Sequence, residues 1–106
     1  MTDGLDKVIR RVRALLATLN EGNGVPSRER IEATLTEGYA AALALDGERL
    51  RLERRMDEVT AHVAHGRSER VREMQKVLAR LEETEQDLAD LRELLTRLRT
   101  RAARAA

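Results

Sequence analysis

His62 and His65 are the residues whose type and spacing come nearest to a reactive centre in this chain. On a helix they lie three positions apart and share one face, with Glu58 one turn before them and Glu69 beyond a predicted turn. Two imidazoles and a carboxylate are the minimum set for a zinc ion or another divalent metal. The helical zinc motif, which has a glutamate between two histidines, is absent. We therefore interpret both residues as surface histidines near a turn, and we expect no metal and no cofactor.

The other arrangements that carry chemistry are also incomplete. Residues 82–90 are rich in carboxylates, but the segment lacks the glycine and the alternating ligands of a calcium loop. Gly22 and Gly24 precede a helix without the Gly-Lys-Ser/Thr that completes a phosphate loop. The chain has no cysteine for thiolate chemistry. Acid-base catalysis needs buried groups in a pocket, which a narrow helical protein does not offer, so we expect no enzymatic activity.

Arginine residues gather at a predicted turn and in the C-terminal segment. They are Arg67, Arg70, Arg72, Arg97, Arg99, Arg101 and Arg104. Basic helical surfaces can follow the phosphates of a nucleic acid. However, acids alternate with the bases at the turn, stacking aromatics are missing, and the formal net charge is only +1. Arginines near a helix C-terminus also match the helix dipole. A nucleic-acid-associated helical arm is therefore the alternative hypothesis, and nucleic acid is not the expected partner.

The composition indicates long helices in a single domain, residues 1–106. Of the 106 residues 37% are charged and 1% aromatic, with Tyr39 as the one aromatic residue, which is typical of coiled coils. No apolar run approaches the roughly 20 residues of a membrane span. The first residues are acidic where a signal peptide is basic. We expect a cytoplasmic protein, and because arginine far outnumbers lysine, a bacterial one.

Hydrophobic periodicity predicts three helices, over residues 4–19, 27–65 and 69–104. The second and third helices carry apolar stripes at heptad spacing. The first stripe is Ile31, Leu35, Gly38, Ala42, Leu45, Arg49, Leu52, Met56, Val59 and Val63. The second stripe is Val71, Met74, Leu78, Leu81, Glu85, Leu88, Leu91, Leu95, Leu98 and Ala102. The stripes match when folded antiparallel, so we predict an all-α fold: a long, coiled-coil-like antiparallel helical hairpin with the short N-terminal helix packed at its base.

Three positions of the second predicted helix bear on this register. Gly38 falls opposite Leu95, where a missing side chain admits a large one. Gly47 lies off the stripe, and because the stripe keeps its phase there, we predict one continuous helix. Arg49 falls opposite Glu85, the charged residue of the other stripe. A buried ion pair adds little net stability, but it fixes the register because a slip would bury a lone charge against leucines.

Some large side chains fall outside the stripes, namely Tyr39, Leu43, Leu50 and Val77. Beyond the short helix the hairpin is expected to be a two-helix arm, which buries little by itself. Exposed apolar residues on such an arm favour a second chain, although single exposed apolar residues are also normal. We therefore predict a homodimer or higher homo-oligomer. The leading hypothesis is a non-enzymatic protein-interaction or assembly module that self-associates through helical hairpin faces and has room for a further protein partner.

Overall fold

The computed structural model describes residues 2–22, 26–63 and 68–105. Over these ranges it contains three α-helices: α1 (Thr2–Glu21), α2 (Arg28–Val63) and α3 (Ser68–Ala105). The predicted all-α fold with a short first helix and two long helices is confirmed. The predicted end of the second helix at residue 65 and the turn at Gly66 and Arg67 lie outside the described residues.

Local sequence signals set the helix boundaries. Gly22 follows α1 with a φ of 68°, a left-handed conformation that glycine adopts readily and that commonly ends a helix. Ser27 precedes α2, and its side-chain oxygen accepts a hydrogen bond of 3.1 Å from the backbone N–H of Arg30. This N-cap satisfies one of the backbone donors that a helix start leaves without an intrahelical partner.

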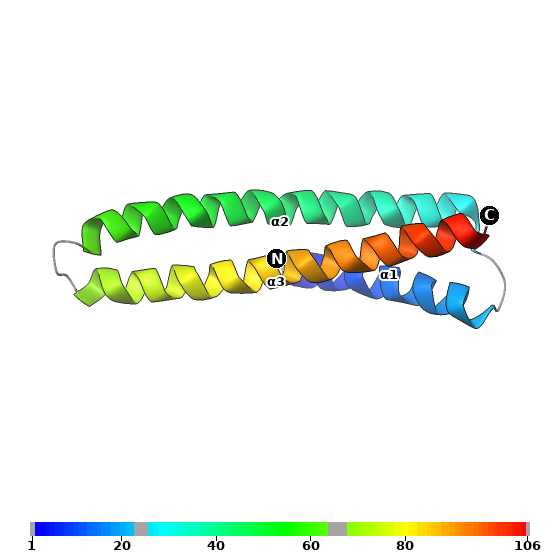
Figure 1. Cartoon of the computed structure of the whole chain (residues 1–106), viewed down its shortest axis with the longest axis horizontal. Helices are drawn as coiled ribbons and strands as arrows, with labels where there is room; N and C mark the ends of the chain where they lie inside the picture. Colours follow the sequence, from blue (N-terminus) through cyan, green and yellow to red (C-terminus); the bar gives the residue numbers. More distant parts are fainter. Residues whose placement is uncertain (1, 23–25, 64–67, 106) are drawn as a thin grey trace. The chain divides into compact units, whose positions relative to one another are not determined.

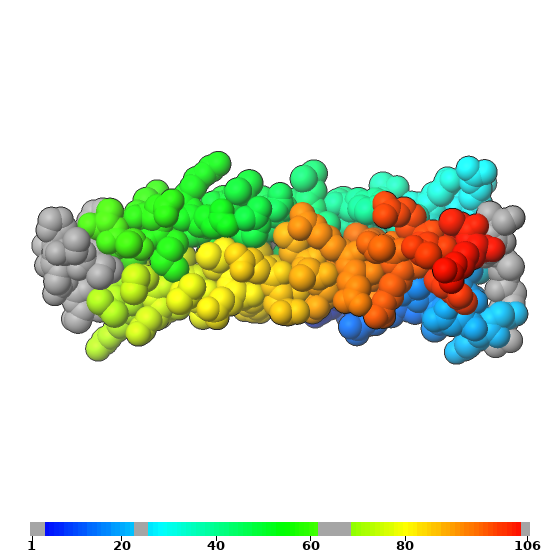
Figure 2. All heavy atoms as spheres, in the orientation of Figure 1, coloured from blue at the N-terminus to red at the C-terminus, as the bar shows by residue number. Residues whose placement is uncertain are grey.

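Contacts within the chain group into two compact units. Unit 1 combines Met1–Leu43 with Ala89–Ala106, and unit 2 is Ala44–Leu88. In unit 1, α1 packs against the first part of α2 and the last part of α3 (Figure 1). In unit 2 the remaining parts of α2 and α3 pair with each other, and the two helices run antiparallel in each unit (Figure 1). Side chains fill the space between the helices of each unit (Figure 2).

Most of the described side chains that are fully buried belong to unit 1. The apolar core of this unit is Val12, Leu15, Leu16, Ile31, Ala42, Leu91, Leu94, Leu95 and Leu98. Among the described residues of unit 2, the buried side chains are Val59, Thr84 and Leu88. A pair of helices without a third partner has little interior, which explains this difference.

Two glycines of α2 behave as predicted. A Cβ atom placed on Gly38 would overlap the side chain of Leu95, so the missing side chain makes room for a leucine of α3. Gly47 lies inside the continuous helix α2, and a Cβ there would meet the nearest atom, Nη1 of Arg51, at 3.6 Å. Gly38 therefore has a packing role, whereas Gly47 is a tolerated interruption of helix-forming residues.

The buried stripe of α3 differs from the predicted one by one residue in three layers. Arg70 and Val77 are half-buried and Thr84 is buried, whereas Val71, Leu78 and Glu85 are exposed. Burying a carboxylate costs far more than burying a threonine, whose hydroxyl can bond to its own helix backbone. The adjacent apolar residues at positions 77 and 78 satisfy either phase. The phase is therefore decided one heptad later, where Thr84 is less costly to bury than Glu85. With Thr84 facing α2, Val77 faces α2 as well, and Leu78 does not.

No helix within the described ranges has both the length and the apolar character that crossing a membrane requires.

Candidate interaction surfaces

One side of α2 in unit 1 is apolar and exposed. Tyr39 is 45% exposed and Leu43 is 73% exposed, and because they are four residues apart they share a face of the helix. Glu37 marks the opposite side of α2, since its carboxylate forms an ion pair with Arg11 of α1. Helix α1 therefore covers one side of α2 and leaves Tyr39 and Leu43 to the solvent.

Ion pairs between α2 and α3 mark one side of unit 2. Arg80 of α3 forms an ion pair with Glu48 of α2 at 2.7 Å, and Arg55 of α2 pairs with Glu73 of α3. On each helix the two residues are seven positions apart, so both pairs flank the same side of the seam. The hydrogen bond with Glu48, together with the charge of that carboxylate, raises the pKa of Arg80 above its ordinary value. Intramolecular pairs thus occupy this side.

The other side of unit 2 carries exposed apolar side chains. Leu50 of α2 is 42% exposed and Leu78 of α3 is 45% exposed. Leu50 comes two residues after Glu48, and Leu78 comes two residues before Arg80, so each leucine points roughly 200° around its helix from the ion pairs. Positions on the same side of the seam share one face of an antiparallel helix pair. Unit 2 therefore has an apolar face opposite its ion pairs.

Arg49 pairs within its own helix, which corrects the predicted pair with Glu85. Its guanidinium donates hydrogen bonds of 2.8 Å to Asp46 and 2.7 Å to Glu53. The hydrogen bond with Asp46 is the largest of the effects that raise the pKa of Arg49. Glu85 is exposed, and the buried stripe of α3 has Thr84 in its place. Asp46 and Glu53 are three and four residues from Arg49 on the same helix, within reach of its long side chain. They balance the charge of Arg49, so it needs no carboxylate from α3.

The structure places the four predicted self-association residues in two environments. Tyr39, Leu43 and Leu50 are exposed. Val77 is half-buried in the stripe of α3, and its neighbour Leu78 takes the exposed position instead. Leu78 was missed because both residues are apolar and the heptad phase was assigned one residue too late. Self-association through these residues stays a prediction.

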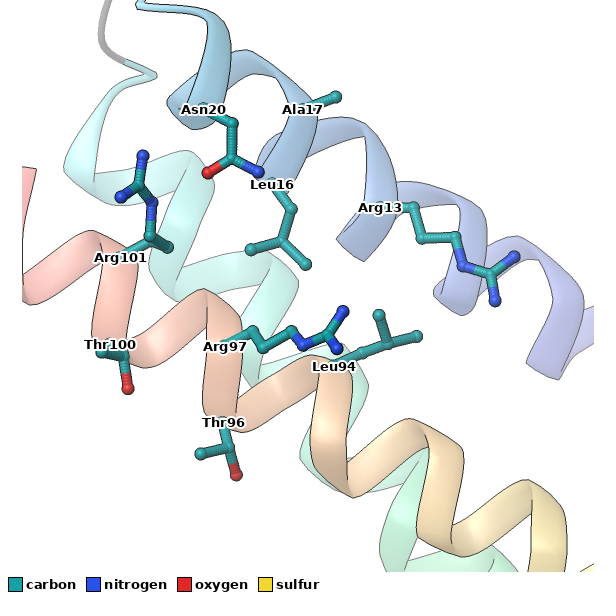
Figure 3. Close-up of a pocket in the computed structure, with 9 residues that line it drawn as sticks. All are labelled: Arg13, Leu16, Ala17, Asn20, Leu94, Thr96, Arg97, Thr100 and Arg101. Carbon is teal, nitrogen blue, oxygen red and sulfur yellow. The ribbon is translucent and has the colours of Figure 1, made fainter.

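An open groove of about 640 Å³ lies in unit 1 between α1 and α3 (Figure 3). Leu16 of α1 and Leu94 of α3 give it an apolar floor. Arg13 of α1, together with Arg97 and Arg101 of α3, brings positive charge to it. The complete lining is Arg13, Leu16, Ala17, Asn20, Leu94, Thr96, Arg97, Thr100 and Arg101. Because no carboxylate is among these lining residues, the groove favours an anionic group over a cationic one.

The C-terminal arginines are partly engaged within unit 1. Arg97 forms an ion pair with Glu93 at 2.8 Å, and Arg101 donates a hydrogen bond of 3.4 Å to the backbone carbonyl of Leu19 in α1. Arg97, Arg99 and Arg104 are exposed, and Arg101 is half-buried. The contact of Arg101 with Leu19 reaches one of the carbonyls at the end of α1, where a cation is favourable.

The predicted turn lies largely outside the described residues. Those outside are His65, Gly66 and Arg67, together with the side chain of His62. Arg70 forms an ion pair with Glu73 at 3.2 Å, and Arg72 is exposed. Within the described part of the chain, no three histidine, aspartate or glutamate residues are grouped so that they could hold a metal ion. Contact of these arginines with a polyanion stays a prediction.

No family model matches the chain, and neither a curated protein nor a solved structure matches it.

Proposed function

We propose that the protein is a non-enzymatic interaction and assembly module that self-associates through the apolar side of its helical hairpin. The observation that carries this proposal is the position of Leu43. It is the most exposed of the large hydrophobic side chains described, and it shares with Tyr39 the side of α2 that faces away from α1. Leu50 and Leu78 give unit 2 an apolar face of the same kind.

The magnitudes require a helix face rather than a single side chain. Full burial of one large apolar side chain contributes about 1.5–3 kcal/mol. Association of two chains costs about 4–15 kcal/mol in lost freedom. Several of the exposed side chains must therefore be buried together, and even then only a small surplus remains. We expect a dimer whose population depends on protein concentration.

A second copy is the partner that suits this surface best. Unit 2 is a pair of helices with a small interior, and a pair of helices gains most when another pair packs on its apolar side as a four-helix bundle. The ion pairs Arg80–Glu48 and Arg55–Glu73 occupy the opposite side of unit 2. The apolar side is therefore the one available for such packing. An isologous contact uses the same patch on both copies and closes without further growth.

Substitution of Leu43 tests the proposal. Leu43→Glu places a charge on the proposed interface, whereas Ala44→Glu adds the same charge about 100° further around the helix. Both positions are exposed, so both variants are expected to fold. Light scattering on a size-exclusion column should give a dimer for the unmodified protein and for Ala44→Glu, and a monomer for Leu43→Glu at the same concentration. An unchanged mass for Leu43→Glu would reject the proposal.

A further inference from the structure

The groove of unit 1 combines an apolar floor with a rim that carries positive charge. Its floor includes Leu16 and Leu94, and its charged members are Arg13, Arg97 and Arg101. Arg97 has a partner in Glu93, but Arg13 forms no ion pair with any residue that the structure describes. In Figure 3 the side chains of Leu16 and Arg97 extend from their two helices into the space between α1 and α3. The groove therefore suits an elongated partner with carboxylates beside a small apolar surface.

The outer face of α3 in unit 2 has this chemistry. Ala79, Glu82, Glu83 and Gln86 are all exposed, and their spacing of three, four and seven residues places them on one helix face, called here the acidic strip. Alanine allows a helix to come close to its partner, and the two carboxylates supply negative charge. The strip lies on the outward side of α3, apart from the buried stripe that includes Thr84 and Leu88.

We propose that the groove of one copy binds the acidic strip of a second copy. The contact is a helix-in-groove arrangement in which Ala79 approaches the apolar floor and Glu82 and Glu83 meet the guanidinium groups of Arg13 and Arg97. It goes beyond the proposed dimer, because it uses the groove and the acidic strip, neither of which includes Tyr39, Leu43, Leu50 or Leu78.

The occupant must come from another copy. Helix α3 forms one wall of the groove and also carries the acidic strip. Glu83 and Arg97 are separated by about 21 Å along this continuous helix. A strip therefore cannot lie in the groove that its own helix lines, whereas the strip of a second copy can.

The two surfaces differ, so the contact is heterologous and can link copies into larger species. Exposed ion pairs contribute little each and are screened by salt. We therefore expect species larger than the dimer at low salt and their loss at high salt. The apolar dimer, in contrast, should persist when salt is added.

Charge reversal on the full chain tests this contact separately from the apolar dimer. One variant carries Arg13→Glu with Arg97→Glu, and the other carries Glu82→Arg with Glu83→Arg. Sedimentation velocity at about 0.05 M salt, where screening is moderate, should show that each variant alone has lost the species larger than the dimer. An equimolar mixture of the two variants should recover them, because the unaltered acidic strip of the groove variant can bind the unaltered groove of the strip variant. In addition, the reversed groove then meets a reversed strip.

A matched control carries Arg54→Glu with Arg72→Glu, which changes the same charge at exposed arginines outside the groove. It should keep the larger species. The proposal is overturned if the groove variant keeps them, if the control loses them equally, or if the mixture fails to recover them. The dimer at about 0.5 M salt should survive both reversals, since the Debye length is then only a few ångströms. Loss of the dimer in the Leu43→Glu variant bears on the proposed function and not on the contact between the groove and the acidic strip.

Discussion

The side chain of Leu95 occupies the space that a side chain at Gly38 would fill. Leu95 is 2% exposed, so it has little freedom to move aside. This pair brings α2 and α3 into close approach in unit 1 and sets the register between them.

Alanine substitutions at Gly38 and Gly47 should change stability in opposite directions. Alanine favours a helix over glycine by about 1 kcal/mol, and a Cβ at Gly47 meets an ordinary contact at 3.6 Å, so Gly47→Ala should raise the free energy of unfolding. At Gly38 the added methyl group overlaps Leu95, and overpacking costs about 1–3 kcal/mol, which should cancel or exceed the gain. Urea unfolding followed by circular dichroism at fixed protein concentration measures both. Equal stabilisation by the two substitutions would contradict the close approach.

Lysine substitutions at adjacent positions of α3 test its corrected phase. Thr84 is 5% exposed, so Thr84→Lys would bury a charge and should lower the free energy of unfolding by about 2 kcal/mol or more. Glu85 is exposed, so Glu85→Lys should change it by no more than about 0.5 kcal/mol. Thermal unfolding of the two variants provides the comparison. A larger decrease in the free energy of unfolding for Glu85→Lys than for Thr84→Lys would support the stripe through Glu85 instead.

The packing of α1 in unit 1 can be tested at Leu15. This side chain is 1% exposed, so Leu15→Ala should lower the free energy of unfolding by about 2–5 kcal/mol through lost burial and the cavity left behind. Leu19, one turn later, is half-buried, and Leu19→Ala should cost less. Because a dimer couples stability to concentration, both variants should be compared at one concentration. Similar losses at the two positions would show that α1 does not pack as described.

Heptad periodicity was sufficient to predict the three helices, the hairpin and the close approach of Gly38 to Leu95. It was wrong at Val71, Leu78 and Glu85, which are exposed, whereas the residue before each of them is buried or half-buried. Heptad spacing placed Glu85 in the predicted stripe, opposite Arg49. In the structure Arg49 uses Asp46 and Glu53 of its own helix instead, since these acids are nearer and require no buried carboxylate.

The candidate surfaces were predictable only in part. The exposure of Leu43 and Leu50 follows from their positions outside the stripe of a single helix. The groove does not follow from any such pattern, because it depends on how α1 packs against α3 and therefore on contacts between Leu16 and residues far away in the sequence. Arg97 and Arg101 were predicted as possible contacts of a polyanion, but Arg13, which lines the same groove, was not.

The solution mass of the unmodified protein tests the central proposal most directly. Light scattering after size-exclusion chromatography should be run over a range of concentrations at about 0.5 M salt, where exposed ion pairs are screened. The account predicts a dimer that dissociates on dilution, because apolar burial survives added salt. A monomer at every concentration would contradict self-association through the side of the hairpin that carries Leu43.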